Sequence, residues 1–334
     1  LAERLDPVGT LMGGQAFRFR PEPDGSVTGL CGTRLANLAY DPPGPDPASP
    51  DRPGRLLLRG VLPEDAAFWI RTLRLGEPEE ALRRRVARDA FHREAVLACG
   101  GIRLLRQPLF ETLVSFILSA RNHIPRIRSL VEALCIGCGE RVRSPLARLL
   151  EPDRGPLFGF PDPERLMAFR PGSCRGNPPG ACRPGARCPE AFGGYRCPAV
   201  FAVADWAAAL GEGGMAAFAA SLRDESPGEA ARRLKALPGV GDKVADCVLL
   251  YAGIRTDVYP VDTWIERLFR IVYPDVVPEP GPGGLEAIRE TALSWFGQDA
   301  GQAQLWGFSL ARAMGPAGLA RFSPSAGSAG IRPT

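Results

Sequence analysis

The sequence predicts an α+β protein in which an N-terminal antiparallel β-sheet domain packs on a mostly α-helical domain. Two observations lead to this class. Over the first 95 residues, short apolar stretches are separated by Pro, Gly and Asp turns, as in antiparallel strands. Beyond them, apolar residues recur at helical spacing. A chain of 334 residues has room for about two domains. We place them at 1–95 and 96–320, followed by a flexible tail over 321–334.

The expected elements follow in chain order. Strands are expected at Ala16–Phe19, Ser26–Leu30 and Arg55–Leu62, with a Pro-rich loop at Asp41–Pro53 and a helix near Pro63–Leu75. Apolar periodicity and helix boundaries predict further helices at Gln107–Arg121, Pro125–Cys138, Ser226–Ala236, Asp242–Gly253, Asp262 onward, Gly284–Trp295 and Ala300–Met314. The clearest helix start is Ser226-Pro-Gly-Glu229, which has the residues of a capping box with Pro at the first helical position.

Charge and apolar content restrict the class of protein. The formal net charge is only +4, so no bulk cationic character indicates a nucleic-acid partner. Of the 41 basic residues, 39 are arginines and two are lysines, Lys235 and Lys243. No run of 18 apolar residues predicts a membrane span. The charged start lacks the apolar core of a signal peptide, and we expect an intracellular, cytoplasmic protein.

The nine cysteines do not predict a disulfide framework in an intracellular chain. Four lie close together: Cys174, Cys182, Cys188 and Cys197. Their spacing lacks the gap of two to four residues that separates paired zinc ligands. We therefore expect a disordered Cys/Pro/Gly-rich insertion near 170–192 rather than a metal site. Cys135 and Cys138 end an apolar helix, and we expect two packed thiols there.

The segment from Lys235 to Asp262 carries the chemistry. Gly239 and Gly241 join two predicted helices by a tight loop, which fits either an ordinary helical hairpin or a phosphate site at a helix N-terminus. Lys243 occupies the first turn of the second helix, where the helix dipole disfavours an ammonium group. This position suits a lysine that acts as a neutral amine. Asp262 precedes an amphipathic helix, which predicts a fixed N-cap carboxylate.

The stretch Leu237–Asp262 closely resembles the helix-hairpin-helix DNA glycosylases with a Gly/Pro-rich loop and a catalytic Asp. Because a lysine, Lys243, follows the hairpin loop, the chain resembles the branch of these enzymes that combines glycosylase and AP-lyase activities. Within that branch, Gly13–Arg18 is similar to the N-terminal domain of the 8-oxoguanine DNA glycosylases. Further similar segments are Ser115–Ile127, Phe158–Pro161 and Gly194–Arg196, so the resemblance covers roughly residues 5–315.

The resemblance implies a role for each matching residue. Lys243 would attack C1′ of the damaged nucleotide and form a Schiff base, and Asp262 would stabilise positive charge on the sugar. The base pocket would consist of Gly14, Cys247, Gln304 and Phe308. DNA contacts would come from Arg121, Asn122, Arg126, Tyr195, Arg196, Gly239, Val240 and Gly241. The carbonyls of Lys235, Leu237 and Val240 would hold a structural monovalent cation.

The implied activity is removal of 8-oxoguanine opposite cytosine from double-stranded DNA, followed by β-elimination. The implied enzyme is a monomer that requires no cofactor and carries no iron–sulfur cluster. Three departures from the family stand out: Arg121 replaces the usual Asn, Trp264 replaces the His of eukaryotic relatives, and the Cys/Pro/Gly-rich segment near 170–192 replaces a helix before Gly194. The alternatives are a non-catalytic helix-hairpin-helix DNA-binding protein and a glycosylase of the same fold for another damaged base.

Overall fold

The computed structural model describes residues 5–41, 54–77, 79–169, 196–277 and 282–324. Within these ranges it confirms the predicted α+β class, with a small antiparallel sheet and a larger helical body. The predicted Pro-rich loop, the predicted insertion near 170–192, Tyr195 and most of the predicted tail lie outside the described residues. No helix in the described ranges is long and apolar enough to cross a membrane.

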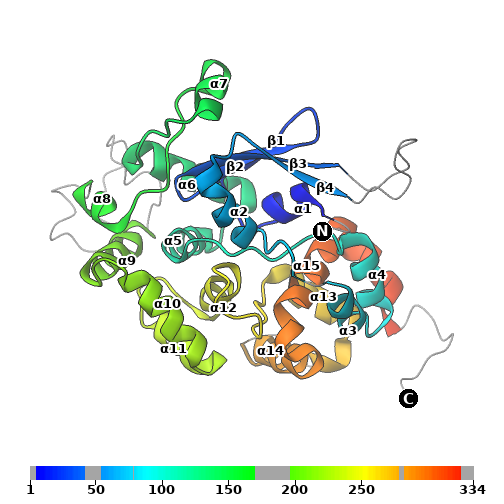
Figure 1. The fold of residues 1–334 in the computed structure, drawn as a ribbon. Coiled ribbons are helices and arrows are strands. Elements are labelled where there is room, and N and C mark those ends of the chain that lie inside the picture. Colours follow the sequence, from blue (N-terminus) through cyan, green and yellow to red (C-terminus); the bar gives the residue numbers. More distant parts are fainter. Residues whose placement is uncertain (1–4, 42–53, 78, 170–195, 278–281, 325–334) are drawn as a thin grey trace, which may run out of the picture.

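The sheet has the order β1-β2-β3-β4, and every neighbouring pair is antiparallel. Its strands are β1 (Phe19–Pro21), β2 (Val27–Cys31), β3 (Arg34–Asp41) and β4 (Arg55–Arg59). All of β2 is buried, because α1 (Pro7–Met12) packs beneath one face of the sheet (Figure 1) and Leu30 packs with Ala147 on the other. Sequence patterns did not predict β3. Its Ala and Asn residues have low strand propensity, and its position between β2 and β4 makes it a strand.

The helices after the sheet form the body of the molecule (Figure 1). They are α2 (Ala66–Thr72), α3 (Glu80–Val86), α4 (Ala90–Cys99), α5 (Leu109–Ser119), α6 (Ile124–Cys138), α7 (Pro145–Arg154), α8 (Pro163–Ala168), α9 (Cys197–Ala209), α10 (Gly214–Asp224), α11 (Pro227–Lys235), α12 (Asp242–Tyr251), α13 (Thr263–Val272), α14 (Pro282–Phe296) and α15 (Ala300–Leu319). Short 3-10 turns are η1 (Pro63–Asp65), η5 (Pro274–Val276), η6 (Gly297–Asp299) and η7 (Ala320–Phe322).

The helix α5 lies at the centre of this body and packs against α6, α9 and α12. Each of its residues from Phe110 to Ser119 is buried, which explains why its sequence is apolar almost all round. The predicted domain boundary at residue 95 remains a prediction. The helix that spans it, α4, buries Phe91 and Ala95 in the large helical core and packs on α15.

Local sequence signals account for several boundaries. Ser226 and Glu229 form the predicted reciprocal capping box at the start of α11. The predicted end of the last helix near Met314 coincides with Gly315, whose φ of 66° interrupts α15. Cys135 and Cys138 are buried thiols at the end of α6, as predicted. Burial raises the pKa of Cys135 to about 12 and that of Cys138 to about 11, so both stay protonated at neutral pH.

Candidate active site

Two glycines shape the hairpin between α11 and α12: Gly239 allows a positive φ in the turn, and Gly241 is the N-cap of α12. Gly239 has a φ of 79°, and a Cβ on it would lie 2.8 Å from Ala199 Cβ and 3.2 Å from Ile117 Cγ2. The tight turn is closed by the Val240 N–H, which donates to the Leu237 carbonyl at 3.2 Å. Gly241 is the N-cap of α12, has no neighbour within 4 Å of an added Cβ, and offers no capping side chain. The first turn of α12 therefore has no N-cap side chain, as an anion site requires, although the Asp242 carboxylate accepts its own backbone N–H.

Lys243 lies in the first turn of α12, half-buried beside aromatic rings. Its Nζ stands 5.0 Å from the centroid of the Phe116 ring, and that ring stacks on Tyr251 at 5.3 Å. The positive charge of Lys243 acts on both Cys247 and Asp262 by lowering the pKa of each. The amine thus lies against an aromatic ring, within electrostatic range of the Cys247 thiol and the Asp262 carboxyl group.

Asp262 is the N-cap of α13, as the sequence predicted. Its Oδ1 accepts hydrogen bonds from the N–H groups of Trp264 and Ile265, both at 2.9 Å. Burial raises the pKa of Asp262, and the two N–H donors, Lys243 and Arg312 oppose this rise. The result is a carboxylate with a fixed position within electrostatic range of the lysine amine.

The predicted base-pocket residues fall into two groups. Gly14 has a φ of 117°, and a Cβ on it would lie 3.0 Å from Ile124 Cδ1 and 3.9 Å from Phe308 Cε1. The Gly14 backbone and the Phe308 ring therefore face each other across a narrow gap. On α12, the Cys247 thiol is 3% exposed, and burial raises its pKa to about 12.

Gln304 connects to the catalytic side of the pocket through Tyr251, a residue that sequence reasoning missed. The Tyr251 hydroxyl donates to Gln304 Oε1 at 3.4 Å, and Gln304 Nε2 donates to the Pro260 carbonyl at 3.1 Å. Both side chains are buried. The signal for Tyr251 is its spacing, because it lies four residues after Cys247 and eight after Lys243, on one face of α12.

A second missed residue, Gln15, fixes the loop that presents Gly14. Its Nε2 donates to the carbonyls of Thr10 at 2.8 Å and Arg103 at 2.7 Å, and its Oε1 accepts from the Leu105 N–H at 3.0 Å. Its side chain is 1% exposed. A fully used buried amide of this kind stabilises one loop conformation. Gln15 in the Gly13–Arg18 motif therefore has a structural role.

The predicted contacts to the opposite strand gather around the turn between α5 and α6. Arg121 is exposed in the left-handed region, with a φ of 53°, while the Asn122 side chain donates to the Leu118 carbonyl at 2.8 Å. Arg126 is exposed at the start of α6. Arg196, at the N-cap of α9, donates to the Ala120 carbonyl. The structure thus brings three predicted arginines to one turn, while Tyr195 lies outside the described residues.

Lys235, the other lysine, pairs with Asp242 across the hairpin at 2.6 Å, and both side chains are exposed. Because Lys235 donates to it, the pKa of Asp242 is lowered. This ion pair holds the end of α11 to the start of α12 and leaves the backbone carbonyls of Lys235, Leu237 and Val240 on the hairpin turn. An exposed pair contributes little to stability, so its main effect is on local geometry.

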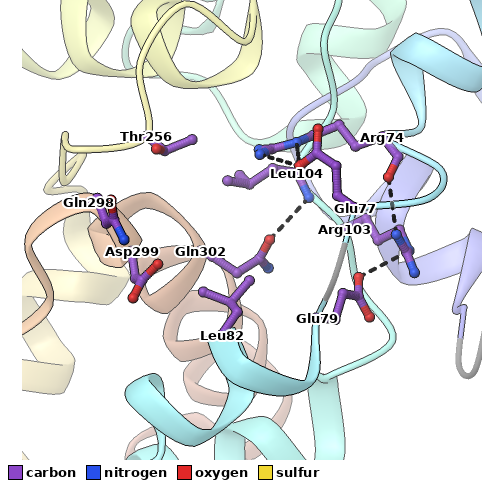
Figure 2. Close-up of a pocket in the computed structure, with 10 residues that line it drawn as sticks. All are labelled: Arg74, Glu77, Glu79, Leu82, Arg103, Leu104, Thr256, Gln298, Asp299 and Gln302. Atoms are coloured by element: carbon purple, nitrogen blue, oxygen red, sulfur yellow. Dashed lines mark hydrogen bonds and ion pairs between the residues drawn. The ribbon is translucent and has the colours of Figure 1, made fainter.

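Figure 2 shows a separate polar cavity of about 80 Å³ whose lining includes none of the predicted site residues. Its charged groups pair with each other: Arg103 lies 3.1 Å from Glu79, and Arg74 lies 2.6 Å from Glu77. Gln302 accepts from the Leu104 N–H at 3.4 Å. The Arg103–Glu79 pair joins the segment after α4 to the segment between α2 and α3, and Gln302 holds the segment after α4 against α15, so we treat this cavity as structural. Within the described ranges, no group of His, Cys, Asp and Glu side chains could hold a metal ion.

No family model matches the sequence, but individual proteins do. A probable N-glycosylase/DNA lyase of Methanothermobacter thermautotrophicus is 38% identical over 88 residues, which are 26% of each chain. The N-glycosylase/DNA lyase OGG1 of Arabidopsis thaliana is 29% identical over 206 residues, which cover 61% of this chain and 50% of that protein. The chain thus spans a half or less of the length of these curated relatives.

Solved structures match over nearly the whole chain. MBOgg1 in complex with a low-affinity DNA ligand has a TM-score of 0.73 and 27% identity, with 93% of both chains covered. The 8-oxoguanine glycosylase/lyase of Clostridium acetobutylicum, bound to double-stranded DNA with cytosine opposite 8-oxoG, has a TM-score of 0.71 and the same coverage. Its identity is 22%, so it supports the fold alone.

The hairpin, the lysine that follows it and the N-cap aspartate define the class, a helix-hairpin-helix DNA glycosylase fold. Within that class, the chain is similar to N-glycosylase/DNA lyases and to the solved structure of MBOgg1.

Proposed function

We propose that this protein is a bifunctional DNA glycosylase and AP lyase that removes 8-oxoguanine opposite cytosine from duplex DNA. The observation that supports this proposal most strongly is the position of Lys243 in the first turn of α12, within electrostatic range of the fixed Asp262 carboxylate and beside the hairpin. A DNA-binding module would need the hairpin but has no use for a half-buried amine next to a fixed carboxylate. A perturbed carboxylate paired with a potential nucleophile is typical of an active site.

The proposed reaction uses the two residues in sequence. The neutral Lys243 amine attacks C1′ of the damaged nucleotide, and the bond from C1′ to N9 breaks with its electron pair moving to the base. The Asp262 carboxylate stabilises the positive charge that develops on the sugar. The departing base anion takes up a proton from the Lys243 nitrogen, and protonation of O4′ by water opens the sugar ring to give a protonated imine to Lys243. Removal of a C2′ proton then expels the 3′ phosphate, which completes β-elimination.

Base recognition in this proposal depends on the Gly14 carbonyl. Oxidised guanine carries an N7–H donor that guanine lacks, and the Gly14 carbonyl would accept it. The fixed loop supports this role, since Gln15 holds the backbone on one side and Phe308 faces it on the other. Gln304 would read the Watson–Crick edge, and Cys247 and Phe308 would contact the two faces of the flipped base.

Double-stranded DNA is the proposed partner. The uncapped N–H groups after Gly241 would bind a phosphate. Flipping a base out of the helix costs a few kcal/mol. The arginines around the α5–α6 turn would offset that cost by binding the unpaired cytosine, with Tyr195 as the proposed wedge. Arg121 in place of Asn makes the strictness of cytosine preference a property to be measured.

The hairpin also suits the proposed monovalent cation. The Leu237 carbonyl already accepts the Val240 N–H, but a carbonyl oxygen has two lone pairs and can still bind a cation. The carbonyls of Lys235 and Val240 would complete the ligand set, and the cation would supply positive charge next to a DNA phosphate. We further propose a monomer that acts inside the cell and requires no other cofactor.

The test is an excision assay on duplexes with a single 8-oxoguanine opposite each of the four bases. We expect base release, detected by mass spectrometry, together with strand cleavage and a preference for cytosine. Lys243→Gln should abolish both, while Arg84→Gln, which alters an exposed helix-surface pair, should leave both unchanged. DNA binding by the wild-type protein without base release would favour a non-catalytic binding protein. If 8-oxoguanine is not released but another damaged base is released from an otherwise identical duplex, the result would favour another glycosylase specificity.

A further inference from the structure

Two arginines from distant parts of the chain lie together beside the predicted base pocket. Arg128 on α6 donates through a terminal nitrogen to the Met12 carbonyl at 3.0 Å, and Arg312 on α15 donates to the Gly13 carbonyl at 3.5 Å. Because these two carbonyls are consecutive in the chain, the two guanidinium groups are neighbours. The backbone just before Gly14 is therefore held between two positive charges.

This pairing of like charges is unfavourable unless an anion compensates it. Burial lowers the pKa of Arg128, and the charge of Arg312 lowers it further. Other arginines pair with carboxylates, as Arg85 does with Asp299 at 2.5 Å. In the part of the chain that the structure describes, Arg128 and Arg312 have no carboxylate within 4 Å, and the enclosed Arg128 Nε has no hydrogen-bond partner. Uncompensated charge of this kind is characteristic of a binding site.

The pair lies one helical turn away from the pocket walls. Arg312 follows Phe308 by four residues on α15, and Arg128 follows Ile124 by four residues on α6. Side chains at this spacing share a helix face. Phe308 and Ile124 are the two residues that face Gly14. Arg312 is exposed and close enough to Asp262 to lower its pKa, so the pair connects the pocket to the surface.

We propose that Arg128 and Arg312 bind a backbone phosphate of the DNA strand next to the flipped nucleotide, at a site distinct from the hairpin. A phosphodiester anion would neutralise the two charges. Each guanidinium has five N–H donors, and one contact to a loop carbonyl leaves most of them for phosphate oxygens. This inference rests on the proposed function, because it takes the flipped nucleotide to enter between Gly14 and Phe308.

The first experiment measures affinity as a function of salt. Wild type, Arg312→Gln, Arg128→Lys and the surface control Arg84→Gln are titrated, as full chains, with a duplex that carries a tetrahydrofuran abasic analogue opposite cytosine. We expect Arg312→Gln to weaken binding and to reduce the slope of log K against log salt by about 0.9, the value for one phosphate. Arg128→Lys keeps the charge and should keep the slope. Arg84→Gln should match wild type.

The second experiment places neutral methylphosphonates one at a time around the lesion. At the contacted phosphate, wild type should lose as much affinity as Arg312→Gln loses on the natural duplex, and Arg312→Gln should lose nothing further. The phosphate site is overturned if Arg312→Gln keeps the wild-type slope and affinity while 8-oxoguanine selectivity falls, because the arginines then only support the Gly14 loop. Absence of duplex binding by wild type also overturns it.

These binding experiments need no chemistry, so they separate the two proposals. If wild type binds with the expected slope difference but releases no base, the proposed function fails and the phosphate site stands. If wild type excises 8-oxoguanine and Arg312→Gln shows no change in salt dependence, the function stands and the phosphate site fails.

Discussion

Substitution of Gly239 tests the hairpin geometry most sharply. Alanine at φ 79° enters the left-handed region, which costs about 1–2 kcal/mol. Its methyl carbon would also stand 2.8 Å from Ala199 Cβ, well inside normal carbon contact, and overpacking of this kind costs about 1–3 kcal/mol. Alanine also lowers the conformational entropy of the unfolded chain, which offsets about 0.4–1 kcal/mol of this destabilisation. We therefore expect Gly239→Ala to lower the free energy of unfolding by about 2–4 kcal/mol.

The measurement is urea unfolding followed by circular dichroism, with Gly241→Ala as the matched control. Gly241 has a φ of −101° and open space around it, so its substitution should change stability by less than about 0.5 kcal/mol. Gly241→Ala should nevertheless weaken DNA binding, because the new methyl group occupies the surface where a phosphate would approach. The reasoning is refuted if Gly239→Ala unfolds at the wild-type urea concentration, or if Gly241→Ala is equally destabilised.

Three further predictions concern buried polar groups. Tyr251→Phe keeps the ring but frees the amide of Gln304, and single-turnover excision should slow about 5-fold, equivalent to one hydrogen bond of about 1 kcal/mol; an unchanged rate would contradict this. Since burial raises the pKa of Asp262 above 3.8, excision should decline on acidification at a higher pH than an exposed aspartate would give, and a flat single-turnover rate down to pH 4 would contradict this. Burial would raise the pKa of Asp89, yet hydrogen bonds from His92 and from Tyr273 hold this pKa at about 2. The ionised Asp89 therefore stabilises the folded protein above pH 3.8, and this stabilisation is lost as the pH falls through about 2. Asp89→Asn should therefore cost about 2 kcal/mol at pH 7 in urea unfolding and flatten this acid dependence, and equal stability of the two proteins would argue against it.

The parts of the fold that could be predicted from sequence are those determined by residues close to each other in the chain. The capping box at Ser226, the glycines of the hairpin and the N-cap at Asp262 involve residues within a few positions of each other. The same local logic failed for β3, whose Ala and Asn residues do not favour a strand. It also missed the six-residue helix α1, which is too short to show a periodicity.

In the candidate site, too, residues with a local sequence signal could be predicted and residues defined by distant contacts could not. Lys243 and Asp262 could be named because each stands at a helix start, where a single residue has a defined electrostatic environment. Gln15 and Tyr251 could not be assigned roles, because their partners are distant in the chain: Gln15 contacts Arg103, and Tyr251 contacts Gln304. Helical spacing places Tyr251 on the same face of α12 as Lys243 and Cys247, but one sequence does not show which distant group Tyr251 or Gln15 contacts.

The arginine content shows most clearly what structure adds. In a chain with 39 arginines, no pattern separates the neighbours Arg128 and Arg312 from the rest. Their proximity arises because α6 and α15 both meet the loop of Met12 and Gly13. The scarcity of lysine had the opposite effect, since it drew attention to Lys243. A guanidinium stays protonated and cannot act as a neutral amine nucleophile.

Borohydride trapping on a duplex with a single 8-oxoguanine opposite cytosine tests the central claim most directly. Reduction of the imine should join the wild-type protein covalently to DNA, and peptide mapping should locate the bond at Lys243. Lys243→Gln should give no adduct, although it still folds and binds the duplex. An adduct that persists in Lys243→Gln, or base release by wild type without any adduct, would contradict the assignment of Lys243 as the nucleophile.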